Sequence, residues 1–589
     1  MKHPDLFYKE QLVKHNLNVK RSKKSLIQFS LVRLIVFVVT GFGIYFMFDQ
    51  SRVAIIFGVV GAVIFLLLLK KYGKVKHEEE LSKALVQINT EEINIASGYF
   101  HNREPGLKYQ DPKHFYSLDI DLFGEGSFFQ YINRTHINEG SQALANVLTA
   151  NSIKDIAERQ EVIKELVLVP EWMQTFSGIA SLIKIETRVD VILNWLKDYQ
   201  VFTPKIMRWL PLLFTSVSAV LFGLNFAEII TGFPVIIWMF IGLIIIGIYL
   251  NKISKLAANS NKIKDTFRQY SLLLHQIESK EFTSDILIEK QRKIRSEGVK
   301  ASLIFREFSK YLDALDNRNN IFFAIVGNGF LLWDLKQSYK IEQWILKYNA
   351  KVKDWFEVIS FFEAYNSLGN FTFNHPEYIF PKIEESNTVI KATNLGHPLV
   401  DKNNRVDNDL MINHQEFFIV TGANMAGKST FLRTVSMYIV MANVGLPVCA
   451  KESCYSPVKL ITSMRTADSL TDDSSYFFSE LTRLKLIVDA IEKESYFIVL
   501  DEILKGTNST DKAIGSRKFV EKLVALNTTG IIATHDLSLC EIESELEEVK
   551  NYYFDAEIIN DELYFDYTFK NGICKNRNAS FLLKKMEII

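Results

Sequence analysis

The sequence predicts an α/β P-loop domain of the ABC type, an all-α domain, and four transmembrane helices arranged as two hairpins. Long apolar runs that occur in two close pairs predict the hairpins. Amphipathic patterns fill most of residues 77–375, and a glycine-bounded loop follows a buried strand near residue 420. A chain of 589 residues is also too long for a single hydrophobic core, so several domains are expected.

The composition is rich in apolar residues and balanced in charge. Hydrophobic residues make up 48% of the chain, and the basic and acidic residues number 68 each. Zero net charge gives no global argument for nucleic-acid binding, although a local basic face remains compatible with it. The four cysteines form no CxxC pair, which indicates a reducing cytoplasm without a zinc or disulfide framework.

The predicted hairpins cover residues 27–70 and 209–250. Each is made of two apolar runs about long enough to cross a hydrocarbon core of ~30 Å. The four runs are residues 31–48, 53–69, 209–230 and 233–250. Pairs of buried core helices are the alternative interpretation, but buried helices seldom pair so closely with so few polar residues.

The charges beside the hairpins predict their orientation. Lysine and arginine before and after each hairpin favour the cytoplasmic side, and only Arg52 lies in a turn on the opposite side. Residues 1–26 are polar and basic, with no cleavage site after the following apolar run, so we expect a cytoplasmic tail and no cleavable signal peptide. The sequence therefore predicts a multi-pass protein of the cytoplasmic (inner) membrane with nearly all of its mass in the cytoplasm.

The all-α domain is predicted in two parts, residues 71–208 and 251–375, on either side of the second hairpin. Apolar residues recur there at three- and four-residue spacing, as in "NKIKDTFRQYSLLLHQIESKEF". A bundle that links the membrane to the C-terminal domain is the simplest interpretation. One segment, residues 118–148, is not explained by helical spacing alone.

Residues 376–589 alternate short β-rich runs with helices, and they contain the phosphate loop. "TGANMAGKST" at 421–430 lies between a buried strand and a helix, which is the context of a P-loop. Gly422 and Gly427 would let the backbone turn its N–H groups towards phosphate. Lys428 would reach the β- and γ-phosphates, and the hydroxyl of Ser429 would ligate Mg²⁺. ATP and Mg²⁺ are therefore the expected ligands.

Two further strand ends complete a predicted hydrolysis site. "SYFIVLDE" ends in Asp501 and Glu502, on what we expect to be a strand neighbouring the loop's own. Asp501 would hold Mg²⁺, and Glu502 would act as the general base towards water. "GIIATHD" places His535 at a strand end, where it would sense the γ-phosphate. The predicted catalytic residues are thus Lys428, Glu502 and His535, and the predicted metal ligands are Ser429 and Asp501.

The loop resembles that of the MutS family of DNA mismatch-repair ATPases, whose hallmark is Asn-Met between the glycines. Asn424 and Met425 match, whereas Ala423 and Ala426 replace the usual Pro and Gly. "LDEILKGTNSTDKAIG" is similar to the family's next motif, with Leu where Gly and Lys where Arg are usual. "LGHPLV" and "ATHD" resemble the family's opening and histidine motifs. The resemblance implies that nucleotide is bound by Gly422, Asn424, Met425, Gly427, Lys428, Ser429, Thr430 and Ser475.

Of these residues, Ser475 implies a homodimer. "MRTADSLTDDSSYFFSEL" resembles the segment whose serine reaches the partner's nucleotide in MutS dimers, although it is shorter here. Ser475 would then act in the partner subunit's site, and the two ATPase domains would form composite sites.

The resemblance extends over about residues 115–575, and the segment at 118–148 is similar to the start of the MutS core or lever domain. The second hairpin falls within the lever, where it would replace or displace the DNA clamp. Residues 1–110 offer no mismatch-reading domain. The chain therefore resembles a membrane-anchored member of the MutS family that lacks the mismatch-recognition domain.

Three functions follow from this resemblance. The leading one is an ATPase whose lever motion acts on mismatched or branched DNA near the membrane. The alternatives are ATP-driven transport or membrane remodelling, and a regulatory scaffold that does not act on DNA. No LSGGQ-like signature precedes the second nucleotide motif, which disfavours a transporter.

Overall fold

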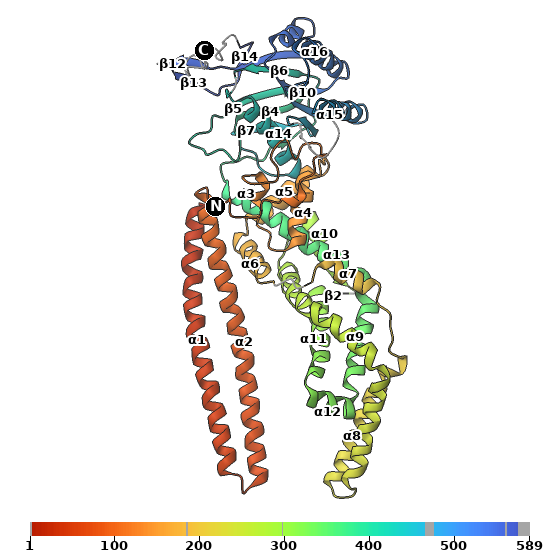
Figure 1. The fold of residues 1–589 in the computed structure, drawn as a ribbon. Coiled ribbons are helices and arrows are strands. Elements are labelled where there is room, and N and C mark those ends of the chain that lie inside the picture. Colours follow the sequence, from red (N-terminus) through yellow and green to blue (C-terminus); the bar gives the residue numbers. More distant parts are fainter. Residues whose placement is uncertain are drawn as a thin grey trace.

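The computed structural model of the chain describes residues 3–183, 187–296, 298–423, 425–465, 476–559 and 562–574. It is elongated, with an α/β domain at one end, a helical core in the middle and two helical legs at the other end (Figure 1). This arrangement confirms the predicted combination of an α/β domain with a mostly helical remainder.

The first leg is an antiparallel pair of long helices, α1 (Pro4–Phe46) and α2 (Ser51–Ala96). Pro4 stands in the first turn of α1, where its missing N–H leaves no helical bond unmade. The basic segment predicted over residues 1–26 is helical from Pro4 and continues without interruption into the apolar run.

The second leg consists of five helices. Helix α8 (Leu210–Phe226) runs away from the core, and α9 (Gly232–Ser279) runs back to it. The others follow one another as α11 (Ala301–Asp316), α12 (Ile321–Leu331) and α13 (Trp333–Asn374). Between α9 and α11 lie α10 (Asp285–Lys293) and the short strands β1 (Arg295–Ser296) and β2 (Val299–Lys300).

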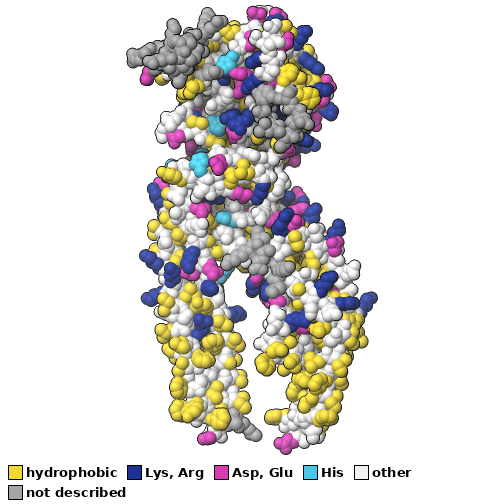
Figure 2. All heavy atoms as spheres, in the orientation of Figure 1, with side chains coloured by type: hydrophobic (Ala, Val, Ile, Leu, Met, Phe, Trp, Pro, Cys, Tyr) yellow, Lys and Arg dark blue, Asp and Glu magenta, His cyan; other side chains and the backbone are white. Residues whose placement is uncertain are grey.

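Three of the described helices, rather than the predicted four, are long and apolar enough to cross a membrane. The segments concerned are Pro4–Phe46, Val53–Ala96 and Gly232–Ser260. The run at 209–230 is helical only over the 17 residues of α8, because the chain turns directly after it and Glu228 adopts φ 59°. Figure 2 shows hydrophobic side chains over the lower parts of both legs, with lysine and arginine side chains gathered above them.

The helical core surrounds the upper end of α13. Its other helices are α3 (Phe128–Ile132), α4 (Asn138–Thr149), α5 (Ile156–Val167), α6 (Pro170–Ser181) and α7 (Val189–Lys197). Short 3₁₀ turns occur at Leu107–Tyr109, Lys205–Arg208 and Asn317–Asn319. Large aromatic side chains such as Phe176, Phe305 and Trp355 are fully buried along α13 and its neighbours.

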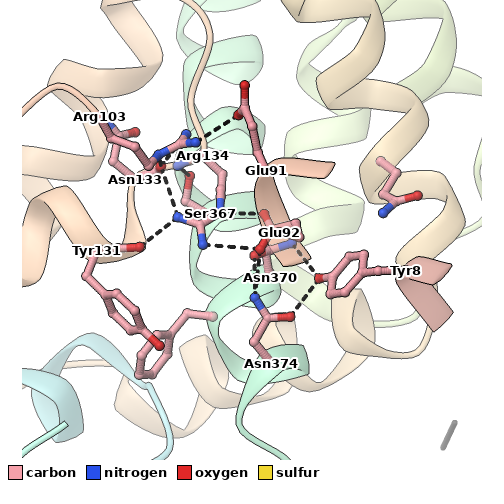
Figure 3. Close-up of polar contacts among 12 residues, drawn as sticks. Tyr8, Glu91, Glu92, Arg103, Tyr131, Asn133, Arg134, Ser367, Asn370 and Asn374 are labelled. Carbon is pink, nitrogen blue, oxygen red and sulfur yellow. Dashed lines mark hydrogen bonds and ion pairs between the residues drawn. The ribbon is translucent and has the colours of Figure 1, made fainter. Parts of the chain in front are cut away.

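A buried polar joint, formed by Tyr8, Glu92, Arg134, Asn370 and Asn374, ties the first leg to the core (Figure 3). Arg134 Nη2 donates to Glu92 Oε2 at 3.2 Å, and Asn374 Nδ2 donates to the same oxygen at 3.0 Å. Tyr8 Oη donates to Asn374 Oδ1 at 2.6 Å. Because Asn374 ends α13 and the chain then enters the α/β domain, the joint connects α1 and α2 to the entrance of that domain.

The core contacts the α/β domain through the segment that helical spacing did not explain. Asp119 Oδ1 accepts the backbone N–H of Arg465 at 2.9 Å, and Asp121 pairs with the guanidinium groups of Arg465 and Arg433. Asn151 bonds both backbone groups of Leu460 at 2.9 Å. These contacts hold the core against the edge strand of the main sheet.

The α/β domain contains a main sheet with the order β14-β11-β6-β10-β9-β8. All neighbours in it are parallel except β14. Its strands are β6 (Phe417–Gly422), β8 (Lys459–Ser463), β9 (Tyr496–Asp501), β10 (Thr529–Ala533), β11 (Val549–Phe554) and β14 (Lys570–Asn571). The helices are α14 (Lys428–Val444), α15 (Tyr476–Ile491) and α16 (Ser509–Ala525), with a 3₁₀ segment at Leu537–Ser544.

A second sheet has the order β3-β7-β4-β5, and β12 and β13 form a separate pair. These strands are β3 (Lys382–Ile383), β4 (Thr388–Leu395), β5 (Asn408–Asn413), β7 (Glu452–Tyr455), β12 (Glu557–Ile559) and β13 (Glu562–Tyr564). The buried strand β6 is central in the main sheet, which places the loop after it at the middle of the sheet's carboxyl edge.

Candidate active site

The predicted phosphate loop connects β6 to α14. Gly427 caps α14 with φ 100°, a left-handed conformation that favours glycine. Gly422 lies against β11, and a Cβ atom there would be only 2.6 Å from the carbonyl oxygen of Phe554. Both glycines are therefore required by the backbone path that turns the loop's N–H groups towards the start of α14.

Lys428 is buried within this loop. Its Nζ donates to the carbonyl oxygens of Gly422 at 2.8 Å and of Ala423 at 3.0 Å. Burial lowers the pKa of the ammonium group, and the nearby carboxylates of Asp501 and Glu502 oppose that shift. A phosphate group in the loop would supply the negative charge that this desolvated cation lacks.

Ser429 and Asp501 meet at the first turn of α14. Ser429 Oγ donates to Asp501 Oδ2 at 2.6 Å. The sequence predicts the acid strand beside β6, but β10 lies between β6 and β9. The contact still forms because parallel strands bring their carboxyl ends to one edge of the sheet, where α14 begins.

Glu502 and His535 face each other across the ends of β9 and β10. His535 Nε2 lies 2.9 Å from Glu502 Oε1, and Glu502 adopts φ 51° with its N–H donated to Ala533 O at 2.9 Å. The hydrogen bond from His535 lowers the pKa of Glu502 to about 2, against the opposing effect of burial. Glu502 is therefore held as a carboxylate. His535 Nε2 also lies 3.3 Å from Lys428 Nζ.

A cavity of about 570 Å³ opens over these residues, which is within the usual range for a small-ligand site. The charged groups Lys428, Asp501, Glu502 and His535 line one part of it. The charged groups Arg405 and Lys505 and several uncharged polar side chains line it as well. Apolar and aromatic side chains also contribute, namely Leu395, Val400, Val406, Phe431, Phe554 and Tyr567. A cavity lined by both charged and aromatic side chains suits a nucleotide, which has phosphates at one end and an aromatic base at the other.

Sequence reasoning missed Tyr567 and Asn408, which also line the cavity. A Cβ atom on Gly427 would lie 3.0 Å from the ring of Tyr567. Asn408 Nδ2 donates to the carbonyl oxygen of Tyr567 at 3.0 Å, and its Oδ1 accepts the N–H of Phe569 at 2.7 Å. No local motif marks this arrangement, because it depends on contacts between residues far apart in the chain.

Most of the predicted site residues line the same cavity. Met425, Gly427, Lys428, Ser429, Thr430, Asp501, Glu502 and His535 all do so. The Met425 side chain is 79% exposed, with φ 68°. His397, of the predicted opening motif, also lines the cavity, and burial lowers its pKa to about 4. Asn424 and Ser475 lie outside the residues that the structure describes.

The residues present fit a magnesium ion that arrives with a nucleotide. Within the described residues, no group of three His, Cys, Asp or Glu side chains forms a complete metal site. Mg²⁺ is commonly held by one or two protein oxygens together with phosphate oxygens and water. The hydroxyl of Ser429 and the carboxylate of Asp501, 2.6 Å apart, provide that kind of partial set.

The fold and this geometry define a P-loop nucleotide-binding domain: a phosphate loop leads into α14, and the acid at the end of β9 contacts the serine of that loop. Residues 418–585 match the family described as MutS domain V.

Curated relatives at modest identity carry the same family name. The chain is 28% identical over 224 residues to the MutS protein homolog 4 of Homo sapiens, covering 36% of the chain and 23% of that protein. It is 32% identical over 189 residues to the DNA mismatch repair protein MutS of Aquifex pyrophilus, a match that covers 30% of the chain and 21% of that protein. It is 34% identical over 186 residues to the DNA mismatch repair protein MutS of Clostridioides difficile (strain 630), a match that covers 30% of the chain and 19% of that protein. The chain therefore carries a MutS domain V, and it spans about a fifth of the length of these relatives.

Proposed function

We propose that the chain is a membrane-anchored MutS-like ATPase that binds ATP with Mg²⁺ and hydrolyses it. The observation that carries this proposal is the meeting of Lys428, the Ser429–Asp501 pair and the Glu502–His535 pair in one cavity. Cation, metal ligands and carboxylate are the parts that phosphoryl transfer to water requires.

Each of these residues has a distinct role in the proposed reaction. The N–H groups of the loop and Lys428 bind the β- and γ-phosphates. Ser429 and Asp501 would hold Mg²⁺, which supplies neutralisation of the phosphate charge. Glu502, kept ionised by His535, orients and polarises the attacking water, and His535 lies between that carboxylate and Lys428.

The two legs support the proposed membrane anchoring. Both expose apolar side chains on their lower parts at a similar level, below a zone of lysine and arginine (Figure 2). In the proposal α1 and α2 form one transmembrane hairpin. The 17 residues of α8 are at the lower limit for crossing the hydrocarbon core, so α8 and α9 form the second. The α/β domain and the core would then lie on the cytoplasmic side of the inner membrane.

DNA is the proposed substrate of the lever motion, since the curated relatives include proteins named for DNA mismatch repair. A homodimer is part of the proposal, with Ser475 reaching the partner subunit's nucleotide. A second candidate function is remodelling of the membrane itself. It is favoured by one observation: the second leg ends in exposed apolar helices, where a DNA-binding surface would be basic.

ATP turnover by the purified protein in lipid nanodiscs tests both candidates. Turnover is measured alone and with perfect duplex, mismatched duplex and branched DNA, at two salt concentrations. Stimulation by DNA that weakens with salt supports the DNA-acting function. Turnover that ignores every DNA and responds to lipid composition supports the second candidate. No turnover in any condition overturns the ATPase proposal, and Glu502→Gln, which leaves the phosphate loop intact, provides the inactive control.

A further inference from the structure

The second leg contains an apolar helix that the sequence analysis assigned to the all-α domain. Helix α12, with the sequence "IFFAIVGNGFL", lies between α11 and α13 in the chain and above the turn that joins α8 to α9 (Figure 1). Ile321, Phe322 and Val326 are largely exposed, Phe322 at 79%. A surface helix in water normally has polar side chains on its exposed face, so a group of large exposed apolar side chains indicates contact with lipid or with another protein.

Helix α12 packs against α9 at the depth of its apolar run. A Cβ atom on Gly242 would lie 2.5 Å from the carbonyl oxygen of Gly329, so the two backbones are in direct contact. Gly242 lies about 15 Å along α9 from Gly232, at about 1.5 Å per residue, which is close to half of a ~30 Å hydrocarbon core. The C-terminal half of α12 is therefore level with the middle of the apolar run.

Polar groups at both ends of α12 have partners within the protein. Its N-terminal N–H groups at Phe322 and Phe323 are accepted by Asn320 Oδ1 at 3.0 and 3.1 Å. At the other end, the carbonyl oxygen of Phe330 lacks a partner in the helix and accepts Ser218 Oγ of α8 at 2.7 Å. Ser218 Oγ in turn accepts the indole N–H of Trp238 of α9 at 2.9 Å. Irregular backbone is tolerated at membrane depth when it is buried in protein in this way.

Charged groups flank α12 at both of its ends. Arg318, just before α12, is half-buried, and Asp334, just after it, is buried, with Arg318 Nε 3.4 Å from Asp334 Oδ2. Arg318 Nη2 also donates to Ser254 Oγ of α9 at 3.2 Å. Ser254 lies between Lys252 and Lys255, which flank the predicted span on its cytoplasmic side. The segment thus enters and leaves at this boundary.

We propose that residues 317–334 form a re-entrant membrane insertion, in which α12 dips from the cytoplasmic side between the acyl chains of the bilayer. Lipid covers Ile321, Phe322, Ile325 and Val326, while Gly329 and Phe330 contact α8 and α9. Lipid is the occupant because the apolar face continues that of α9 at the same depth. The inference rests on the proposed anchoring through α9. It adds that α13, which runs from α12 to the polar joint, connects the bilayer directly to the core.

The test uses single cysteines labelled with an environment-sensitive fluorophore in proteoliposomes. The background is Cys454→Ser, since Cys454 is the half-buried native cysteine and the others are buried. The reporters are Phe322→Cys on α12, Ile244→Cys on α9 (66% exposed) and Leu303→Cys on α11 (54% exposed). We expect lipid brominated on its acyl chains to quench the reporters at 322 and 244 to a comparable degree, and the reporter at 303 to be quenched by aqueous iodide only.

Other outcomes separate this inference from the proposed anchoring. Quenching by brominated lipid at 244 but not at 322 overturns the re-entrant insertion and leaves the anchoring intact. No quenching by brominated lipid at either position overturns both. A reporter at 322 that is shielded from lipid and from iodide alike identifies a protein cover, such as a second copy of the chain, and also overturns the inference.

Discussion

His535 Nε2 lies 2.9 Å from Glu502 Oε1, and this contact controls the acidity of the proposed catalytic carboxylate. The hydrogen bond is the largest influence on Glu502 and lowers its pKa to about 2, although burial alone would raise it. The imidazole thus keeps Glu502 ionised at every pH at which the protein is expected to work. It also weakens Glu502 as a proton acceptor, so the carboxylate is better suited to orienting water than to removing its proton fully.

The first prediction is that His535→Ala introduces an acid limb into the pH dependence of ATP turnover. Without the imidazole, the largest influence that lowers the pKa of Glu502 is lost, and the raising effect of burial is opposed only by Lys505 and Lys512. The fall in turnover with decreasing pH should therefore begin at a higher pH in the variant than in the parent protein, in which Glu502 remains ionised down to about pH 2. We also expect slower turnover at neutral pH, because the imidazole no longer orients Glu502 towards water. Steady-state rates between pH 4 and 8 measure both effects.

The matched control is His414→Ala, which removes a half-buried histidine from the β5–β6 turn, outside the cavity. It should keep the parent profile. A flat profile for His535→Ala would contradict the assigned role of the contact.

The second prediction concerns Lys428, whose buried ammonium donates to the carbonyl oxygens of Gly422 and Ala423. Lys428→Met should weaken ATP binding by roughly 10- to 100-fold, since hydrogen bonds to charged groups contribute about 1.5–3 kcal/mol. Because burial of the cation is unfavourable, the variant without nucleotide should be at least as stable as the parent. Binding of a fluorescent ATP analogue and thermal unfolding test the two statements. Lys451→Met, at an exposed lysine of the same domain, is the control.

The third prediction concerns the polar joint. Glu92→Gln leaves the buried guanidinium of Arg134 without its counter-charge and should destabilise the protein by about 3–5 kcal/mol. The double variant Glu92→Met/Arg134→Met should be less destabilised than either single replacement, because no unpaired charge remains. Thermal unfolding in detergent measures the cycle. The exposed Lys74–Glu78 pair of α2, with 3.9 Å between its charged atoms, should contribute no more than ~0.5 kcal/mol.

The fourth prediction uses Glu363, which is buried on α13 and accepts the N–H groups of His136 at 2.6 Å and Ile137 at 3.2 Å. Burial raises its pKa to about 7, and these two bonds only partly oppose the shift. The folded protein therefore binds this proton more tightly than the unfolded chain. Its contribution to stability is largest below about pH 4.5 and is lost as the pH rises to about 7, by about 3 kcal/mol in all.

Glu363→Gln should remove that pH dependence while keeping an oxygen acceptor for the two N–H groups. The measurement is the difference in unfolding temperature between pH 5 and pH 8, for the parent and the variant. An equal difference in both proteins would show that Glu363 does not carry the effect.

The parts of the fold that follow from local pattern were predictable from the sequence. The phosphate loop, α14 and the acids Asp501 and Glu502 are adjacent to their strands in the chain, so motif and periodicity place them. The insertion of β10 between β6 and β9, and the approach of Tyr567 to Gly427, depend on pairings between distant segments. Helix α12 was missed for a related reason. Its 11 residues are too short for a span, and only its contact with Gly242 places it at membrane depth.

The last prediction tests that contact. Gly242→Val places a side chain within 2.5 Å of the Gly329 carbonyl oxygen, an atom that cannot move without shifting the backbone of α12. We expect α12 to separate from α8 and α9, so that the rings of Phe222 and Phe330, with centroids 4.8 Å apart, lose their contact. A flexible bismaleimide crosslink between Phe222→Cys and Phe330→Cys reports this: it should form readily in the parent background and poorly after Gly242→Val. Gly247→Val is the matched control, because it adds the same side chain to α9 at a glycine with no neighbour within 4 Å. Equal crosslinking in both backgrounds would show that the close approach of Gly242 and Gly329 does not hold α12 in place.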